Sequence, residues 1–100
     1  MSNRLQGKVA IISGGGGAMG GAQARLFSSE GAAVCVADNR IEKAEEISAE
    51  IIHSGGKAFA TNLDVRSADE WATTVSKTES KLGSVSLLCN NAGANFRVGF

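Results

Sequence analysis

Proline and tyrosine are absent from the 100-residue sequence, and its formal net charge is zero. Ten basic side chains balance ten acidic ones, so no net field draws the chain toward nucleic acid or anionic lipid. Long apolar stretches are lacking too. The longest one near the amino terminus, residues 9–12, is too short for a membrane-spanning helix or the apolar core of a signal peptide. These absences predict a cytoplasmic protein that binds neither nucleic acid nor membrane.

Hydrophobic residues make up 43% of the chain and charged residues 20%, as in a globular domain and unlike a disordered segment. A chain of this length is one domain or part of one, and it can bury roughly two thirds of its extended-chain surface. Glycine is distributed unevenly, since six of the 13 glycines fall between Gly14 and Gly21.

Apolar runs of strand length alternate with segments of helical periodicity. The apolar runs have no polar face, as expected for strands covered on both sides, and Ala22, Leu26 and Phe27 are expected to share one side of the first helix. Strands joined by helices form βαβ units with parallel strands. The pattern predicts an α/β fold with a doubly wound, Rossmann-like parallel sheet, here partial with four strands and three helices. The expected strands are residues 9–12, 33–37, 58–63 and 85–89, and the expected helices are about 20–30, 39–54 and 67–82.

Two predicted helix starts have the residue spacing of a capping box. Asn39 precedes Glu42 by three positions, and Ser67 precedes Glu70 by three. In such a box the first side chain accepts a hydrogen bond from the backbone N–H three residues later. We therefore expect Asn39 and Ser67 to cap the second and third helices.

The glycine cluster follows the first predicted strand and opens the first predicted helix. Glycines let the backbone turn tightly and approach a diphosphate without an intervening Cβ, and the helix presents free N–H groups and a positive dipole end to the same anion. Gly15, Gly17 and Gly20 match the generic dinucleotide-binding spacing, and their place between a strand and a helix adds weight. No Lys-Ser or Lys-Thr pair follows the glycines, which excludes a Walker loop.

Asp38 ends the second predicted strand, 18 residues after Gly20. A carboxylate there can accept both hydroxyls of an adenosine ribose and would repel a 2′-phosphate, so it favours NAD over NADP. The alternative is that Asp38 only caps the next helix, although Asn39 is also available as a cap. Arg40 could reach a 2′-phosphate, but the carboxylate has more weight because it lies at the strand end itself.

Two further loops complete a family pattern. Asp64 and Val65 follow the third predicted strand, and Asn-Asn-Ala-Gly at residues 90–93 follows the fourth. Together with the glycine loop and Gly-Lys-Val-Ala at residues 7–10, these motifs resemble the N-terminal part of the short-chain dehydrogenases/reductases. The resemblance covers nearly the whole chain, and Asn-Asn-Ala-Gly is a specific signature of that family.

The resemblance implies an NAD(P)-dependent oxidoreductase that interconverts an alcohol and a ketone by hydride transfer, this chain supplying the NAD-binding half. The family's phosphate loop falls on residues 13–20, with Ala18 in place of the middle glycine, which adds a methyl group close to the diphosphate. Residues 64 and 65 would contact adenine, residues 91–93 would line the nicotinamide-side ribose, and Asn90 would brace the sheet. The implied cofactor-binding residues are Ser13, Gly14, Gly15, Gly16, Gly17, Met19, Gly20, Asp38, Asp64, Val65, Asn91, Ala92 and Gly93.

The catalytic residues of this family have no counterpart in the chain. The family uses a Tyr-x-x-x-Lys pair, a serine and a further asparagine beyond the fourth strand, with the tyrosine as general acid/base. The sequence has no tyrosine and stops at Phe100, so we assign it no catalytic residue and no metal ligand. We expect an N-terminal fragment of a longer enzyme, inactive alone, whose partners are a nicotinamide dinucleotide and a small alcohol or ketone. The resemblance also implies that the full-length protein is a homo-oligomer.

The two cysteines are expected to stay reduced. In the family's strand order, 3-2-1-4-5, the first strand separates the strands that hold Cys35 and Cys89. Strands two places apart put their Cα atoms about 9–10 Å apart, whereas a disulfide needs less than about 7 Å. We therefore expect two buried thiols.

Two other functions fit parts of the pattern. A non-catalytic nucleotide-binding module could consist of this half alone. An S-adenosylmethionine methyltransferase also has a glycine loop and an acid after its second strand, but it usually carries an acidic residue just before the glycines. Here Ile12 and Ser13 stand at that point, and a methyltransferase lacks Asn-Asn-Ala-Gly.

Overall fold

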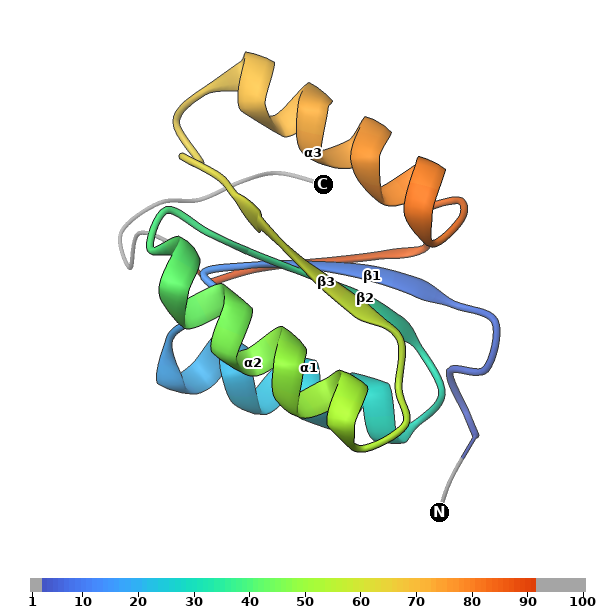
Figure 1. Cartoon of the computed structure of the whole chain (residues 1–100). Coiled ribbons are helices and arrows are strands. Elements are labelled where there is room, and N and C mark those ends of the chain that lie inside the picture. Colours follow the sequence, from blue (N-terminus) through green and yellow to red (C-terminus); the bar gives the residue numbers. More distant parts are fainter. Residues whose placement is uncertain (1–2, 92–100) are drawn as a thin grey trace.

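The computed structural model describes residues 3–91, and all four strands in that range are parallel. They form one sheet in the order β3-β2-β1-β4. Helices α1 and α2 cover one face of the sheet and α3 covers the other (Figure 1). This arrangement confirms the predicted α/β fold with its partial doubly wound sheet. In chain order the elements are β1 (Val9–Ser13), α1 (Ala18–Ser29), β2 (Ala33–Asp38), α2 (Ile41–His53), β3 (Ala58–Asn62), α3 (Ala68–Lys81) and β4 (Leu87–Asn90).

The core has two apolar clusters because successive side chains of a strand point to opposite faces of the sheet. On one face, Ile12, Val34 and Val36 pack against buried residues of α1 and α2. On the other face, Ile11 and Cys35 join a cluster that the partly buried side chains of α3 cover. Burying one aliphatic side chain of this size contributes about 1.5–3 kcal/mol, so the central strands hold the loops at their carboxyl ends in place.

Helix α1 contacts the sheet through its smallest residues. Its buried residues are Gly20, Gly21 and Ala24. Ala22 and Leu26, which were expected to share one side of the helix, are both exposed, so the sheet contact of α1 does not use these two side chains. A Cβ at Gly20 would collide with the backbone carbonyl of Gly14, so α1 approaches the loop more closely than larger side chains would allow.

The two predicted helix caps have different outcomes. Ser67 caps α3, accepting a hydrogen bond from the Glu70 N–H at 3.1 Å. The prediction for Asn39 is wrong: Arg40 is the N-cap of α2, and no side chain caps it. The physical reason lies one residue earlier, where the Asp38 carboxylate accepts the Arg40 N–H at 2.9 Å and turns the chain into the helix.

Strand β1 separates the two cysteines as expected, with Ile11 beside Cys35 and Ile12 beside Cys89. Both thiols are free in the structure; Cys35 is buried as expected, but the expectation of burial is wrong for Cys89, which is only partly buried because it lies on β4, at the edge of the sheet. Burial raises the pKa of the Cys35 thiol to about 11, against the opposing effect of a hydrogen bond with Thr78. Neither thiol has the lowered pKa of a reactive cysteine.

Candidate functional site

The glycine loop leaves β1 at the carboxyl edge of the sheet and folds back on itself. The Gly15 N–H donates to the carbonyl of Ala37 on β2 at 3.0 Å, and the Gly17 N–H donates to the carbonyl of Gly14 at 3.1 Å. Gly14 has a φ of +66°, a left-handed conformation that side chains disfavour. The loop is therefore tied to both central strands.

Packing requires a glycine at some positions of the loop and not at others. A Cβ at Gly15 would lie 2.8 Å from the Ile12 carbonyl oxygen, and one at Gly16 would lie 2.6 Å from Lys43 Cβ. A Cβ at Gly17 would meet nothing closer than 3.4 Å. The loop is therefore tightly packed at Gly15 and Gly16 and has room for a side chain at Gly17.

The first turn of α1 offers its backbone donors to a ligand. Gly17 is the N-cap, no side chain bonds to the turn, and it carries no acidic residue. Such a helix start attracts an anion through its free N–H groups and its positive dipole end. Ala18 and Met19 are exposed there, so the extra methyl group of Ala18 faces outward.

Asp38 is buried at the end of β2, with 5% of its surface exposed. Its Oδ2 accepts the Gly16 N–H at 3.0 Å, and its Oδ1 accepts the Arg40 N–H at 2.9 Å. The Arg40 guanidinium, 58% exposed, forms an ion pair with the same carboxylate at 3.4 Å. The carboxylate is therefore held directly beside the glycine loop. Its Oδ2 keeps capacity for a further donor, whereas Oδ1 already accepts two N–H groups of Arg40.

The glycine loop, the end of β2 and the residue after β4 surround one hollow of about 310 Å³. The hollow lies at the carboxyl ends of the strands, where open α/β sheets bind their ligands. Its lining combines two loop glycines and two residues of the first turn of α1 with polar side chains that lie at or just after the ends of β2 and β4. It is lined by Gly14, Gly17, Met19, Gly20, Asp38, Asn39, Arg40 and Asn91.

A hydrogen-bonded network joins the end of β4 to the end of β1. The Ser13 hydroxyl donates to Asn90 Oδ1 at 2.6 Å, which ties Asn90 to the sheet. Asn91 Nδ2 donates to the Ser13 carbonyl at 3.3 Å and to Gln23 Oε1 on α1 at 2.7 Å. The structure thus brings Ser13, Gly14, Gly17, Met19, Gly20, Asp38 and Asn91 to one place.

Asp64 and Val65 lie outside the lining of this hollow. Arg66 forms an ion pair with the Asp64 carboxylate at 3.1 Å and lowers the pKa of that group. Val65 packs in the cluster under α3, and its carbonyl accepts the indole N–H of Trp71 at 2.9 Å. Ala92 and Gly93, also predicted to bind the cofactor, lie outside the described residues.

Sequence reasoning missed Gln23 and Arg66. Gln23 lies one turn after Gly20 on the side of α1 that meets the end of β4, and Arg66 shares a turn with Asp64. Two sequence features could have indicated these residues. Gln23 is a polar residue within a run of small ones, and Arg66 carries a charge opposite to that of Asp64, two positions earlier.

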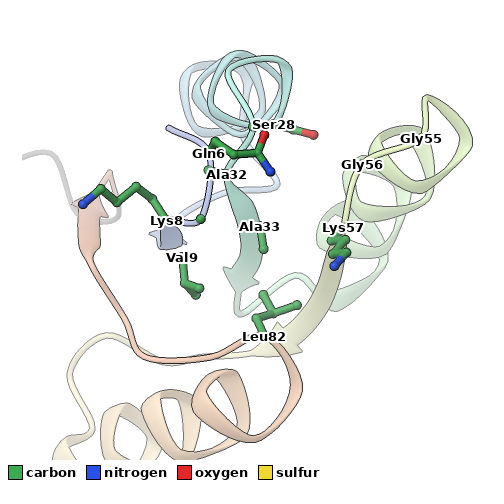
Figure 2. Close-up of a pocket in the computed structure, with 12 residues that line it drawn as sticks. Gln6, Lys8, Val9, Ser28, Ala32, Ala33, Gly55, Gly56, Lys57 and Leu82 are labelled. Atoms are coloured by element: carbon green, nitrogen blue, oxygen red, sulfur yellow. The ribbon is translucent and has the colours of Figure 1, made fainter. Parts of the chain in front are cut away.

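A second hollow, also about 310 Å³, lies at the opposite edge of the sheet, where the strands begin (Figure 2). Val9, Ala33 and Leu82 line it, with Lys8 and Lys57 at its rim. Figure 2 shows the Lys8 amine directed away from Ala33 and Leu82. No acidic side chain lines this hollow, whereas Asp38 lines the first one.

The model of one protein family, short chain dehydrogenase, matches residues 8–100 of the chain. The chain belongs to the short-chain dehydrogenases. It is 41% identical over 100 residues to the 2,5-dichloro-2,5-cyclohexadiene-1,4-diol dehydrogenase LinX of Sphingobium indicum. It is 42% identical over 90 residues to the 7alpha-hydroxysteroid dehydrogenase of Escherichia coli. All of this chain matches the first relative and 90% of it the second, but it spans only 40% and 35% of their lengths.

Solved structures of short-chain dehydrogenases have the same fold. A hydroxysteroid dehydrogenase from Escherichia coli matches with a TM-score of 0.86 at 42% identity, over 90% of this chain and 38% of that one. A 7α-hydroxysteroid dehydrogenase complexed with NADH and 7-oxo glycochenodeoxycholic acid matches with a TM-score of 0.83 at 39% identity, over 87% and 34%. Membership makes this chain part of an oxidoreductase family and confirms the resemblance drawn from the motifs.

The part of the chain that the structure describes contains neither a membrane-spanning helix nor a cluster of metal-binding side chains. None of the helices there is long and apolar enough to cross a membrane. Residues 3–91 also hold no cluster of three or more histidine, cysteine, aspartate or glutamate side chains that could bind a metal ion.

Proposed function

We propose that the hollow at the carboxyl ends of the strands binds NAD, and that the chain is the cofactor-binding part of an enzyme interconverting an alcohol and a ketone. One observation carries the proposal. A buried carboxylate, that of Asp38, accepts an N–H of the glycine loop at 3.0 Å and lines the same hollow as that loop. This combination supplies donors for a diphosphate and an acceptor for a ribose at neighbouring points.

The diphosphate would lie against residues 14–20, where bare backbone and the uncapped start of α1 meet. The adenosine ribose would donate its hydroxyls to Asp38, and Asp64 and Val65 would contact adenine beyond the hollow. Asn91, with Ala92 and Gly93, would line the ribose on the nicotinamide side.

Charge favours NAD over NADP at the ribose. A 2′-phosphate would come close to the buried Asp38 carboxylate, and two negative charges that lie close together repel each other. Arg40 could offset that repulsion, but its guanidinium already pairs with Asp38 and is mostly exposed. A charge that is shared and solvated compensates little, so the carboxylate decides the preference.

The bound dinucleotide would accept or donate a hydride at the nicotinamide carbon, which is the chemistry that the cofactor supplies. The residues of this chain would hold the cofactor and exclude 2′-phosphate. We assign them no acid/base role, because the family's tyrosine has no counterpart among the 100 residues. Catalytic turnover would require the family's Tyr-x-x-x-Lys pair, which these 100 residues do not contain.

Substitution of Asp38 tests this proposal by calorimetric titration with NAD and NADP. Asp38→Ala should weaken NAD binding by about 1.5–3 kcal/mol, because charge-assisted hydrogen bonds to the ribose are lost. NADP should be affected less, so the preference for NAD narrows. Asp38→Asn keeps the side-chain shape and should narrow the preference as well.

Asp69→Ala is the matched control, since Asp69 is an exposed carboxylate in the first turn of α3, away from the hollow. It should leave both affinities unchanged. An unchanged ratio of NAD to NADP affinity in both Asp38 variants would contradict the ribose assignment. Absence of any binding by the unaltered protein would contradict the proposed function itself.

A further inference from the structure

We propose that Gln23 is a positioning residue, which orients the Asn91 amide so that its carbonyl oxygen is the group presented to the nicotinamide-side ribose. The inference rests on the proposed function, because the ribose is part of the NAD that the hollow is proposed to bind. Gln23 belongs to α1 and Asn91 follows β4, 68 positions later. Their contact is a side-chain link between the phosphate-binding helix and the residue after β4.

The chemistry of the partners determines which way the Asn91 amide points. An asparagine amide has an NH₂ group that only donates and an oxygen that only accepts. The backbone carbonyl of Ser13 is an acceptor and lies 3.3 Å from one end of the amide, so that end is the NH₂ group. Gln23 Oε1 is a second acceptor, 2.7 Å from the same nitrogen.

The shorter of these two bonds is the one that Gln23 Oε1 accepts. The Ser13 carbonyl also accepts the backbone N–H of Asn91 at 3.1 Å, so its bond to the side chain is the longer and shared one. The Ser13 carbonyl can only accept and so sets this orientation, and Gln23 Oε1 reinforces it with the shorter bond to the same nitrogen. Because the NH₂ group donates to protein acceptors, the Asn91 oxygen is the amide atom that can accept a hydrogen bond from a hydroxyl group of a ligand.

A ribose hydroxyl needs such an acceptor. Asn91 lines the hollow, while Gln23 is not among the lining residues and so acts through Asn91 rather than on the ligand. If the amide were free to rotate by half a turn, the NH₂ group would face the ribose in part of the molecules. The hydroxyl would then lose its acceptor in that fraction, and binding of this ribose would weaken.

Two ligands isolate the effect, because ADP-ribose contains the second ribose and ADP does not. We compare their dissociation constants by calorimetric titration in the unaltered protein, Gln23→Met and Gln23→Glu. Gln23→Met keeps an unbranched chain of similar length without an acceptor. Gln23→Glu keeps an acceptor, and any repulsion of the diphosphate by its charge affects both ligands and cancels in their ratio.

Gln23→Met should weaken ADP-ribose binding by about 3- to 10-fold, as expected for one lost hydrogen bond, and leave ADP binding unchanged. Gln23→Glu should keep the ADP-ribose to ADP ratio of the unaltered protein. Gln6→Met, at the opposite edge of the sheet, is the matched control and should change neither ligand. A role in stability alone would shift both ligands together with the melting temperature.

The outcomes separate this inference from the proposed function. If the unaltered protein binds ADP and the ratio is the same in Gln23→Met, the positioning role is overturned and the cofactor site stands. If ADP-ribose binds no better than ADP in the unaltered protein, the positioning role is overturned as well. If neither ligand binds, the proposed function fails and this inference fails with it.

Discussion

At the scale of single residues, the glycines of the loop have different physical reasons to be glycine. Gly14 needs its left-handed φ, Gly20 leaves room for the close approach of α1, and Gly16 touches the first turn of α2. Gly17 has no comparable neighbour. Sequence spacing alone could not separate these roles, because a run of four glycines satisfies several patterns at once.

Gly16→Ala should destabilise the protein by about 1–3 kcal/mol, the usual cost of overpacking. Its Cβ would lie 2.6 Å from Lys43 Cβ, 2.9 Å from the Ala44 nitrogen and 3.0 Å from Asp38 Oδ2, so α2 or the carboxylate would have to move. Urea unfolding followed by circular dichroism measures the change. Gly17→Ala, where the nearest atom lies at 3.4 Å, is the control and should cost far less. Equal costs for the two variants would show that this contact does not constrain the loop.

Part of the site could be predicted residue by residue. The loop after β1, Asp38 and Asn91 were all named from the sequence, because strand ends and glycine spacing are local features that survive folding. The bonds of Asp38 to Gly16 and Arg40 were not, since they depend on how β2 and the loop face each other. Gln23 escaped for the same reason: its partner is remote in sequence.

At the scale of elements, the starts of α1 and α3 differ in a way that matches their surroundings. Helix α3 is capped by Ser67 and has Asp69 and Glu70 in its first turn, which satisfies its free donors within the protein. Helix α1 has no side-chain cap and no acid there. The N–H groups at the start of α1 are therefore left for solvent or a ligand to satisfy. The difference therefore supports a ligand at α1 and a structural role for α3.

Ser67→Ala should lower the free energy of unfolding by about 1 kcal/mol, because the bond to the Glu70 N–H at 3.1 Å is lost. Thermal and urea unfolding measure the loss. Ser76→Ala, at an exposed position within α3, is the matched control and should be neutral or slightly stabilising, because alanine favours helix. A neutral Ser67→Ala would contradict the capping role.

Element boundaries were predicted less well than element types. Helix α1 begins at Ala18, two residues before the expected start, because the loop already turns into the helix at Gly17. Strand β4 begins at Leu87 rather than residue 85, because its pairing with β1 starts with Ala10 opposite Leu87. Both of these boundaries depend on contacts with segments that are distant in sequence or irregular. The apolar periodicity of the sequence does not indicate such contacts.

At the scale of the whole molecule, the two apolar clusters make the central strands β1 and β2 the most buried part of the chain. The order of the four strands, β3-β2-β1-β4, is the one that the resemblance to the short-chain dehydrogenases/reductases implied. The cluster under α3 contains Cys35, whose thiol is buried between the sheet and that helix. The pKa of this thiol therefore depends on the packing of α3 against the sheet.

Stability should fall as pH rises from about 9 toward 11. Burial raises the pKa of the Cys35 thiol from 9.0 to about 11, so in this window the unfolded chain loses the thiol proton while the folded chain keeps it. Cys35 then contributes a loss of about 1–3 kcal/mol. Urea unfolding at pH 8 and pH 10.5 measures the loss, and it should shrink in Cys35→Ala. An identical pH dependence in both proteins would refute this linkage.

The central claim is tested most directly by a crystal structure of the protein with NAD bound. We expect the adenosine ribose hydroxyls within hydrogen-bond distance of the Asp38 carboxylate and the diphosphate against residues 14–20. Asn91 should meet the second ribose through its amide oxygen. Adenosine bound elsewhere, such as at the hollow beside Lys8 and Lys57 where the strands begin, would contradict the account.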